Sequence, residues 1–216
     1  MTTRTVQAAL TITPLRPPPT PPTPPIYYAM TNERFPIPEV DVSKVDPKWW
    51  RTEVDYPTDE RAGIVIVDTP NRYLYHVQPH GRATRYGVGV GRDGFSWAGR
   101  GRHIAYKREW PRWTPPDEMV ARQPELEPYS IANGGMDPGL KNPLGARAMY
   151  LGSSEYRIHG TNDPSTIGKF VSSGCIRLTN EDVSDLFSRV DVGTKVVVLP
   201  KNAPHLAARE LGPSTT

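Results

Sequence analysis

The sequence contains a single cysteine, Cys175, among its 216 residues. A lone cysteine cannot form a disulfide within the chain, so it is either a small buried packing residue or a reactive thiol. A thiol redox cycle would need a second, resolving cysteine, and the chain has none. The cysteine content is compatible with any cellular compartment.

Long apolar segments are also lacking. No stretch approaches the ~20 apolar residues that cross a bilayer, so we expect no transmembrane span. The first 25 residues include a mildly apolar run, but Pro14 interrupts it, and the run is short for the apolar region of a signal peptide. The sequence therefore shows no clear signal peptide.

Features of nucleotide, nucleic-acid and metal sites are weak. The 26 Lys and Arg against 23 Asp and Glu give a net charge of +3, and no basic run appears, which argues against a nucleic-acid partner. The glycines of "GVGVG" (87–91) are not followed by a helical pattern, as a dinucleotide fingerprint requires. His76 and His80 have the spacing of a helical zinc pair, but Pro79 lies between them in a β-rich region, so we predict no metal site.

Proline is abundant near the start, with the run "PLRPPPTPPTPP" over 14–25. Such a run favours extended polyproline geometry and cannot form a core, so residues 1–35 are expected to be a disordered leader. Residues 36–61 include Trp49 and Trp50 and are interpreted as an aromatic strap that leads into the domain. The globular domain is expected over 62–199, followed by a polar tail over 200–216.

Within the domain the pattern is mostly that of strands. "GIVIVDT" and "RYLYHVQ" predict a hairpin, and further strands are expected near 84–92, 148–152, 155–160, 174–178 and 194–200. A short helix is expected between Pro116 and Pro124. Residues 179–190 predict an amphipathic helix capped by Thr179. The Trp-, Pro- and Gly-rich segment 107–145 resembles a lid or binding loop. The fold class is thus mainly β, with a few short helices and a long lid-like loop.

One pair of segments has the residue types of a nucleophilic site. His159 ends a predicted strand, Cys175 begins another, and the 15-residue loop between them allows the chain to fold back. A histidine can take the proton from a thiol, which is mostly protonated at neutral pH. Amides at Ser173, Gly174 and Cys175 would suit an oxyanion hole. Arg177 shares a strand face with Cys175 and is a candidate ligand for a substrate carboxylate.

The segment "IHGTNDPSTIGKFVSSGCIRLTNEDVSDLF" closely resembles the active-site segment of the L,D-transpeptidase catalytic domain, the YkuD family. The family signature is a His-Gly-Thr strand followed by Ser-(His/Ser)-Gly-Cys-(Ile/Val)-(Arg/Asn), and the resemblance extends over about residues 62–199. Many members have a second histidine before the glycine, where this chain has Ser173. His159, the residue that the family mechanism uses as base, is retained.

The resemblance implies a β-sandwich-like fold and a peptidoglycan cross-linking enzyme without a metal or an organic cofactor. Cys175 would attack the carbonyl between diaminopimelate and the terminal D-alanine of a tetrapeptide stem, with His159 as general base. The implied oxyanion and substrate-binding residues are Gly160, Ser172, Ser173, Gly174 and Arg177. The family acts outside the cytoplasmic membrane, so a periplasmic or cell-wall location is expected.

The acceptor of the acyl group is left open by the sequence. An amine on another stem gives a cross-link, an amine on an outer-membrane protein gives an anchor, and water gives an L,D-carboxypeptidase or hydrolase. The rival class is a non-catalytic peptidoglycan-binding module, which would not depend on Cys175.

Overall fold

The computed structural model describes residues 23–91, 101–154, 156–172, 174–199 and 209–210. Most of the predicted leader and tail, and Ser173, lie outside these residues. The strands are β1 (Thr52–Asp55), β2 (Val65–Asp68), β3 (Tyr73–Gln78), β4 (Arg82–Gly87), β5 (Val90–Gly91), β6 (Gly101–Glu109), β7 (Arg147–Leu151), β8 (Arg157–His159), β9 (Phe170–Ser172), β10 (Ile176–Arg177), β11 (Lys195–Val198) and β12 (Arg209–Glu210). The α-helices are α1 (Asp117–Arg122) and α2 (Asn180–Arg189), and the 3-10 helices are η1 (Pro25–Tyr27), η2 (Val42–Lys44), η3 (Pro47–Trp49), η4 (Pro124–Tyr129) and η5 (Pro164–Thr166).

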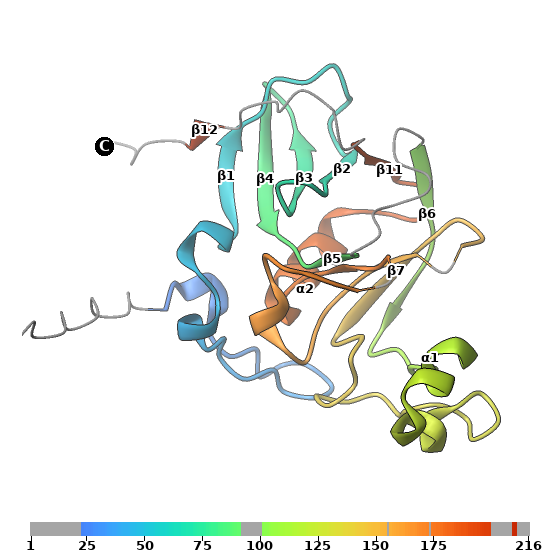
Figure 1. Cartoon of the computed structure of the whole chain (residues 1–216). Coiled ribbons are helices and arrows are strands. Elements are labelled where there is room, and N and C mark those ends of the chain that lie inside the picture. The colour runs from blue at the N-terminus through green and yellow to red at the C-terminus, as the bar shows by residue number, and fades with distance from the viewer. Residues whose placement is uncertain (1–22, 92–100, 155, 173, 200–208, 211–216) are drawn as a thin grey trace, which may run out of the picture.

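The architecture is mainly β, as predicted. Within the described residues, ten strands form one sheet in the order β10-β8-β7-β6-β11-β2-β3-β4-β1-β12, and β5 pairs with β9 outside it (Figure 1). The pairs β8–β10 and β2–β11 are parallel, whereas the other neighbours in the large sheet are antiparallel. The helices of this part of the chain are all too short or too polar to cross a bilayer.

The predicted hairpin is β2 and β3, and β2 is buried along its whole length. Successive side chains of a strand point to opposite faces, so such a strand contributes to two apolar clusters. Val65 and Val67 belong to the main core, and Ile66 belongs to a second cluster with Tyr75 on the other face. Burial on both faces explains why the first three residues of β2 are all apolar rather than alternating with polar ones.

Helix α2 lies between the β4 end of the sheet and β7 (Figure 1). Thr179 caps it as predicted, since its hydroxyl accepts a hydrogen bond from the Asp182 amide at 3.1 Å. The buried apolar face, which includes Val183, Leu186 and Val190, joins the main core. The helix therefore fixes the chain that directly follows β10.

The segment before β1 packs against the domain. Trp49 and Tyr27 are buried in one apolar cluster, and the Tyr27 hydroxyl donates to Asp182 Oδ2 at 3.0 Å. Glu33 forms an ion pair with Arg147 at 2.5 Å, with both side chains largely buried. The packed strap thus begins ahead of residue 36, the boundary that the sequence suggested.

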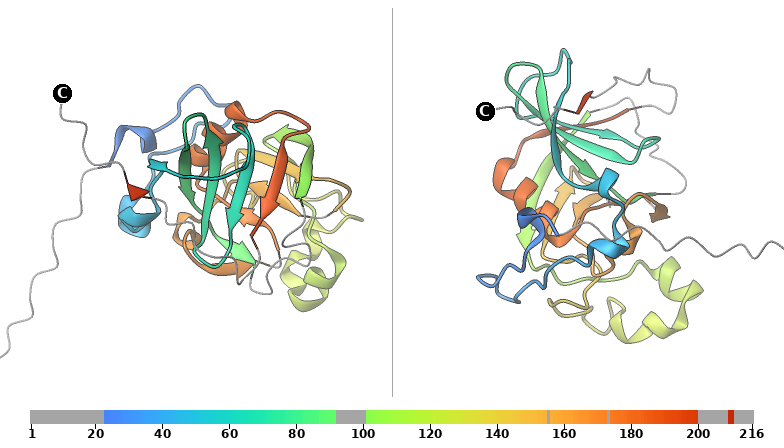
Figure 2. Two further views of the ribbon diagram at one scale, coloured as in Figure 1. Left: turned by 90° about the horizontal axis from the view of Figure 1, so that it is seen from above. Right: turned by 90° about the vertical axis from the view of Figure 1, so that its left-hand side faces the viewer.

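Helices α1 and η4 project from the molecule on the side away from β1–β4 (Figures 1 and 2). We call residues 117–129 the α1–η4 lobe. Helix α1 lies where the short helix after Pro116 was predicted. The sequence did not reveal β6, whose side chains are mostly exposed and show little apolar alternation.

Candidate active site

The two segments predicted to carry the site lie on adjacent strands. β8 and β10 pair in parallel, with Ile158 opposite Ile176 and His159 opposite Arg177. Opposed residues in a sheet share a face, and both isoleucines are fully buried in the main core. His159 and Arg177 therefore lie on the other face. Cys175, one residue before β10, falls on the same face by alternation.

His159 is held as a neutral imidazole. Its side chain is buried, and its Nδ1 lies 2.6 Å from the carbonyl oxygen of Gly160. A carbonyl can only accept a hydrogen bond, so Nδ1 carries the proton and Nε2 has the free lone pair. Burial, followed by the positive charge of Arg177, lowers the pKa of His159 to about 3. The ring is thus in the protonation state of a general base at neutral pH.

The residue before the cysteine must be glycine for two reasons. Gly174 has φ +137°, which side chains rarely adopt. A Cβ at this position would also lie 2.4 Å from Cε1 of Tyr156. The partly exposed thiol of Cys175 is therefore presented by a backbone turn that packs directly on an aromatic ring. Of the other residues predicted here, Ser172 ends β9, and Ser173 lies outside the described residues.

The residue after the histidine is equally confined. A Cβ at Gly160 would lie 2.4 Å from Asn180 Oδ1, and that same oxygen accepts a hydrogen bond from the Ala146 amide at 2.9 Å. Asn180 is buried at the start of α2. The helix thus holds the backbone just before β7 by one hydrogen bond, and the same oxygen packs against the residue that follows β8. Sequence reasoning missed Asn180, and its position directly after the Thr179 cap was the available signal.

The backbone of Arg177 is hydrogen-bonded to Gly89, and its side chain lies on the same face as His159. Its amide donates to Gly89 O at 2.8 Å, and its carbonyl accepts from Gly89 N at 2.9 Å. Burial lowers its pKa, and the neighbouring Cys175 acts in the opposite direction. Its Nε is buried with no hydrogen-bond partner within the described residues, and the same holds for Arg157 Nε. The structure thus brings Arg177 close to both His159 and Cys175.

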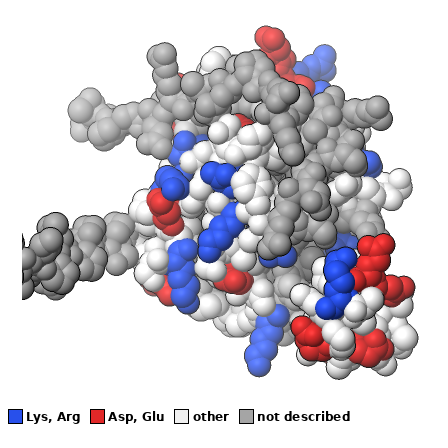
Figure 3. All heavy atoms as spheres, in the orientation of Figure 1, with Lys and Arg blue, Asp and Glu red and all other residues white. Residues whose placement is uncertain are grey.

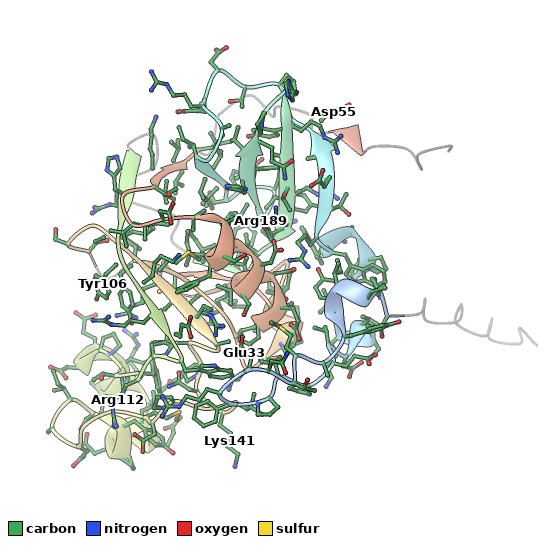
Figure 4. The ribbon with its side chains drawn as sticks, turned by 180° about the vertical axis from the view of Figure 1, so that it is seen from behind. Glu33, Asp55, Tyr106, Arg112, Lys141 and Arg189 are labelled. Carbon is green, nitrogen blue, oxygen red and sulfur yellow. The ribbon has the colours of Figure 1, made fainter. Side chains whose placement is uncertain are left out.

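An aromatic wall borders this face, and the sequence did not predict it. Arg157 of β8 pairs with Tyr150 of β7, which pairs in turn with Tyr106 of β6. A pocket of about 400 Å³ next to these strands is lined by Tyr106, Arg108, Pro111, Arg112 and Tyr150. Figure 4 shows Tyr106 and Arg112 on the same side of the molecule, with Arg112 next to the α1–η4 lobe.

The predicted lid segment is folded back on itself. Trp113 and Met136 form an antiparallel bridge, and the Asn142 side chain donates to Pro111 O at 3.0 Å. Trp110 is buried and donates to Glu33 Oε2 at 2.9 Å, so this tryptophan packs the strap onto the domain. Within the described residues, no group of three or more His, Cys, Asp or Glu is arranged to hold a metal ion.

The family model and the curated relatives indicate one family. The family model described as YkuD, L,D-transpeptidase catalytic domain, matches residues 62–198. The chain is similar to a putative L,D-transpeptidase in the ATP synthase subunits region of Fuscovulum blasticum, 45% identical over 96 residues and covering 44% of this chain and 47% of that protein. It is also similar to the probable L,D-transpeptidase YbiS of Escherichia coli K12, 36% identical over 145 residues and covering 65% of this chain and 45% of that protein.

Among solved structures, a probable carnitine operon oxidoreductase caia from Brucella melitensis is 44% identical, with a TM-score of 0.48, and the match covers 74% of this chain and 99% of that one. The chain spans about half the length of the curated relatives it matches.

Proposed function

The chain belongs to the L,D-transpeptidase catalytic-domain family, and from this premise we propose that it is a cysteine-dependent acyltransferase acting on peptidoglycan tetrapeptide stems. The observation that carries the proposal is the pairing of β8 with β10, which sets a neutral, buried His159 beside the strand that follows Cys175. A thiol and an imidazole on the same face of adjacent strands, with the imidazole Nε2 unprotonated, suit nucleophilic acyl transfer, in which the imidazole takes the thiol proton.

In the first step, Sγ of Cys175 attacks the carbonyl carbon between diaminopimelate and the terminal D-alanine. His159 Nε2 takes the thiol proton, and a C–S bond forms as the carbonyl becomes a tetrahedral oxyanion. The amides at Gly174 and Cys175 are the candidate donors to that oxyanion. The C–N bond then breaks, the imidazolium returns its proton to the amine, and D-alanine leaves a thioester on Cys175.

The low pKa of His159 bears on the timing of proton transfer. Burial and Arg177 disfavour an imidazolium while the neighbouring thiol is neutral. Negative charge on Cys175 would reverse that preference, because an opposite charge stabilises the imidazolium. We therefore propose that the resting pair is thiol and neutral imidazole, and that the proton moves as the thiol attacks.

The second step transfers the acyl group to an acceptor. An amine on a second stem, or on an outer-membrane protein, attacks the thioester and restores the thiol, and water in its place would give a carboxypeptidase. Since these substrates lie outside the cytoplasmic membrane, the proposed site of action is the periplasm or the cell wall.

The test is intact-protein mass spectrometry after mixing the chain with a disaccharide-tetrapeptide. The expected result is an adduct with the mass of the stem minus D-alanine, absent from Cys175→Ala and strongly reduced in His159→Gln. Circular dichroism establishes that both variants are folded. Amine acceptors added afterwards distinguish transfer from hydrolysis. Folded wild-type protein that gives neither adduct nor free D-alanine with several stems would refute the proposal and favour a binding module.

A further inference from the structure

Two arginines and two tyrosines form a continuous stack beside the candidate site. The Arg157 guanidinium carbon lies 5.4 Å from the centre of the Tyr150 ring. The rings of Tyr150 and Tyr106 are stacked with centroids 4.1 Å apart and planes at 14°. The Arg108 guanidinium carbon lies 5.5 Å from the centre of the Tyr106 ring. We call these four residues the Arg–Tyr ladder.

The ladder lies on the same face as His159. In the register of the sheet, Arg157 stands opposite Tyr150 and Tyr150 opposite Tyr106, and the core residues alternate with them. Continuing the β8–β10 register by one residue places Cys175 level with Arg157. One end of the ladder therefore adjoins the proposed nucleophile, and the other end, at Arg108, lies two strands away.

The arginines on this face have no carboxylate at ion-pair distance among the residues that the structure describes. Within the part of the chain that the structure describes, Arg108, Arg157 and Arg177 form no ion pair with a carboxylate, whereas Arg112 and Arg147 do. The Nε atoms of Arg157 and Arg177 are buried, and neither has a hydrogen-bond partner in the described part of the chain. A guanidinium that stacks on a ring keeps its N–H edge available for a planar anion such as a carboxylate.

The surface next to this face is acidic. The adjacent α1–η4 lobe carries the acidic residues Asp117, Glu118, Glu125 and Glu127, and Figure 3 shows acidic side chains gathered over that lobe. An anion would thus be attracted to the arginines of the ladder and repelled by the acidic α1–η4 lobe. The 400 Å³ pocket at the Arg108 end offers the room for it.

We propose that the Arg–Tyr ladder is a carboxylate-binding subsite that selects peptides with a free carboxylate remote from the bond that Cys175 attacks. The inference rests on the proposed function, and it adds a charge requirement to the substrate. Adjacent strands are about 4.8 Å apart, so Tyr106, in register with Arg157 through Tyr150, lies about 10 Å from it. Arg108 is two residues, or about 7 Å, further along β6, which puts the backbone positions of Arg157 and Arg108 about 12 Å apart. That span matches about three to four residues of extended peptide. Arg108 is the specificity-determining residue at the far end.

The experiment measures binding apart from turnover. Calorimetry on the full chain carrying Cys175→Ala measures the affinity for two compounds. The first is a disaccharide-tetrapeptide with all its carboxylates free. The second is the same compound in which the internal carboxylate farthest from D-alanine is converted to a carboxamide. We expect the free acid to bind about tenfold tighter, as a partly exposed charge-assisted hydrogen bond gives. Adding Arg108→Gln should remove this difference. Adding Arg61→Gln, which removes an exposed arginine from the β1–β2 connection, should leave the difference unchanged.

The outcomes separate this proposal from the proposed function. Equal affinity for the two compounds, or a difference that persists in folded Arg108→Gln protein, overturns the ladder proposal even if wild-type protein forms the Cys175 adduct. Conversely, an affinity difference that Arg108→Gln abolishes supports the ladder, even if no adduct forms and the acyl-transfer proposal fails. Arg108 is exposed at the end of β6, so its replacement leaves the core intact.

Discussion

Replacing Gly174 by alanine should destabilise the protein through two separable effects. The first is backbone strain, because φ +137° lies in a region that is essentially restricted to glycine. Such strain costs on the order of 1–3 kcal/mol. The second is steric overlap, because the new Cβ would lie 2.4 Å from Tyr156 Cε1. Forcing an atom into a packed site costs a further ~1–3 kcal/mol.

Gly139 provides a matched control. It has φ +153° and nothing within 4 Å of the position that a Cβ would take. Gly139→Ala should therefore show the strain without the overlap, a loss of on the order of 1–3 kcal/mol. Gly174→Ala should lose more unfolding free energy than Gly139→Ala, and the difference should equal the cost of the overlap with Tyr156. Tyr156→Leu, which removes the ring, should recover most of that excess when combined with Gly174→Ala.

Urea unfolding followed by circular dichroism measures these free energies for the wild type, the three single variants and the double variant. The urea concentration at the midpoint of unfolding should change, while the dependence of the unfolding free energy on urea concentration (the m-value) should stay the same. Equal losses for the two glycine variants, or no coupling between Gly174→Ala and Tyr156→Leu, would refute the reasoning. In that case the glycine before the cysteine would be explained by substrate access alone. The same proteins, assayed for adduct formation on Cys175, would report how far the turn positions the thiol.

Three further predictions concern buried charges. Burial raises the pKa of Asp182 from 3.8 to about 7, so between these pH values the folded protein holds a proton that the unfolded chain has released. The free energy of unfolding should therefore fall as the pH rises from about 4 to 7, by up to about 1.4 kcal/mol per pH unit. Urea unfolding of Asp182→Asn across this range should show a smaller dependence of the unfolding free energy on pH. Glu33→Gln leaves Arg147 without its buried partner and should cost about 2–3 kcal/mol of unfolding free energy, whereas Asp46→Asn, in an exposed pair, should leave it nearly unchanged. Since the pKa of His159 is lowered to about 3, His159 should stay neutral as the pH falls through 6.5. The rate of adduct formation, timed by mass spectrometry, should therefore show no loss with a midpoint near pH 6.5. A loss with that midpoint would contradict a buried neutral base.

Local patterns in the sequence were sufficient for much of the secondary structure. The β2–β3 hairpin, helix α1 and the Thr179-capped helix α2 form where they were predicted, because each depends on neighbouring residues. β6 was missed because most of its side chains are exposed and its apolar alternation is faint. The sequence did not show that Tyr27 packs on the domain, because its hydroxyl bonds Asp182 of α2, which is distant in sequence.

The sequence by itself determined the family and the candidate nucleophile and base, because the spacing of Cys175 and His159 and the residues around them form a local motif. The tertiary structure decided what surrounds them. The register of β6, β7, β8 and β10 aligns Arg157, Tyr150 and Tyr106 on one face with His159, and these strands come from separate parts of the chain. Burial likewise sets the protonation state of His159, and solvent exclusion is a property of the packed fold that no short sequence motif contains.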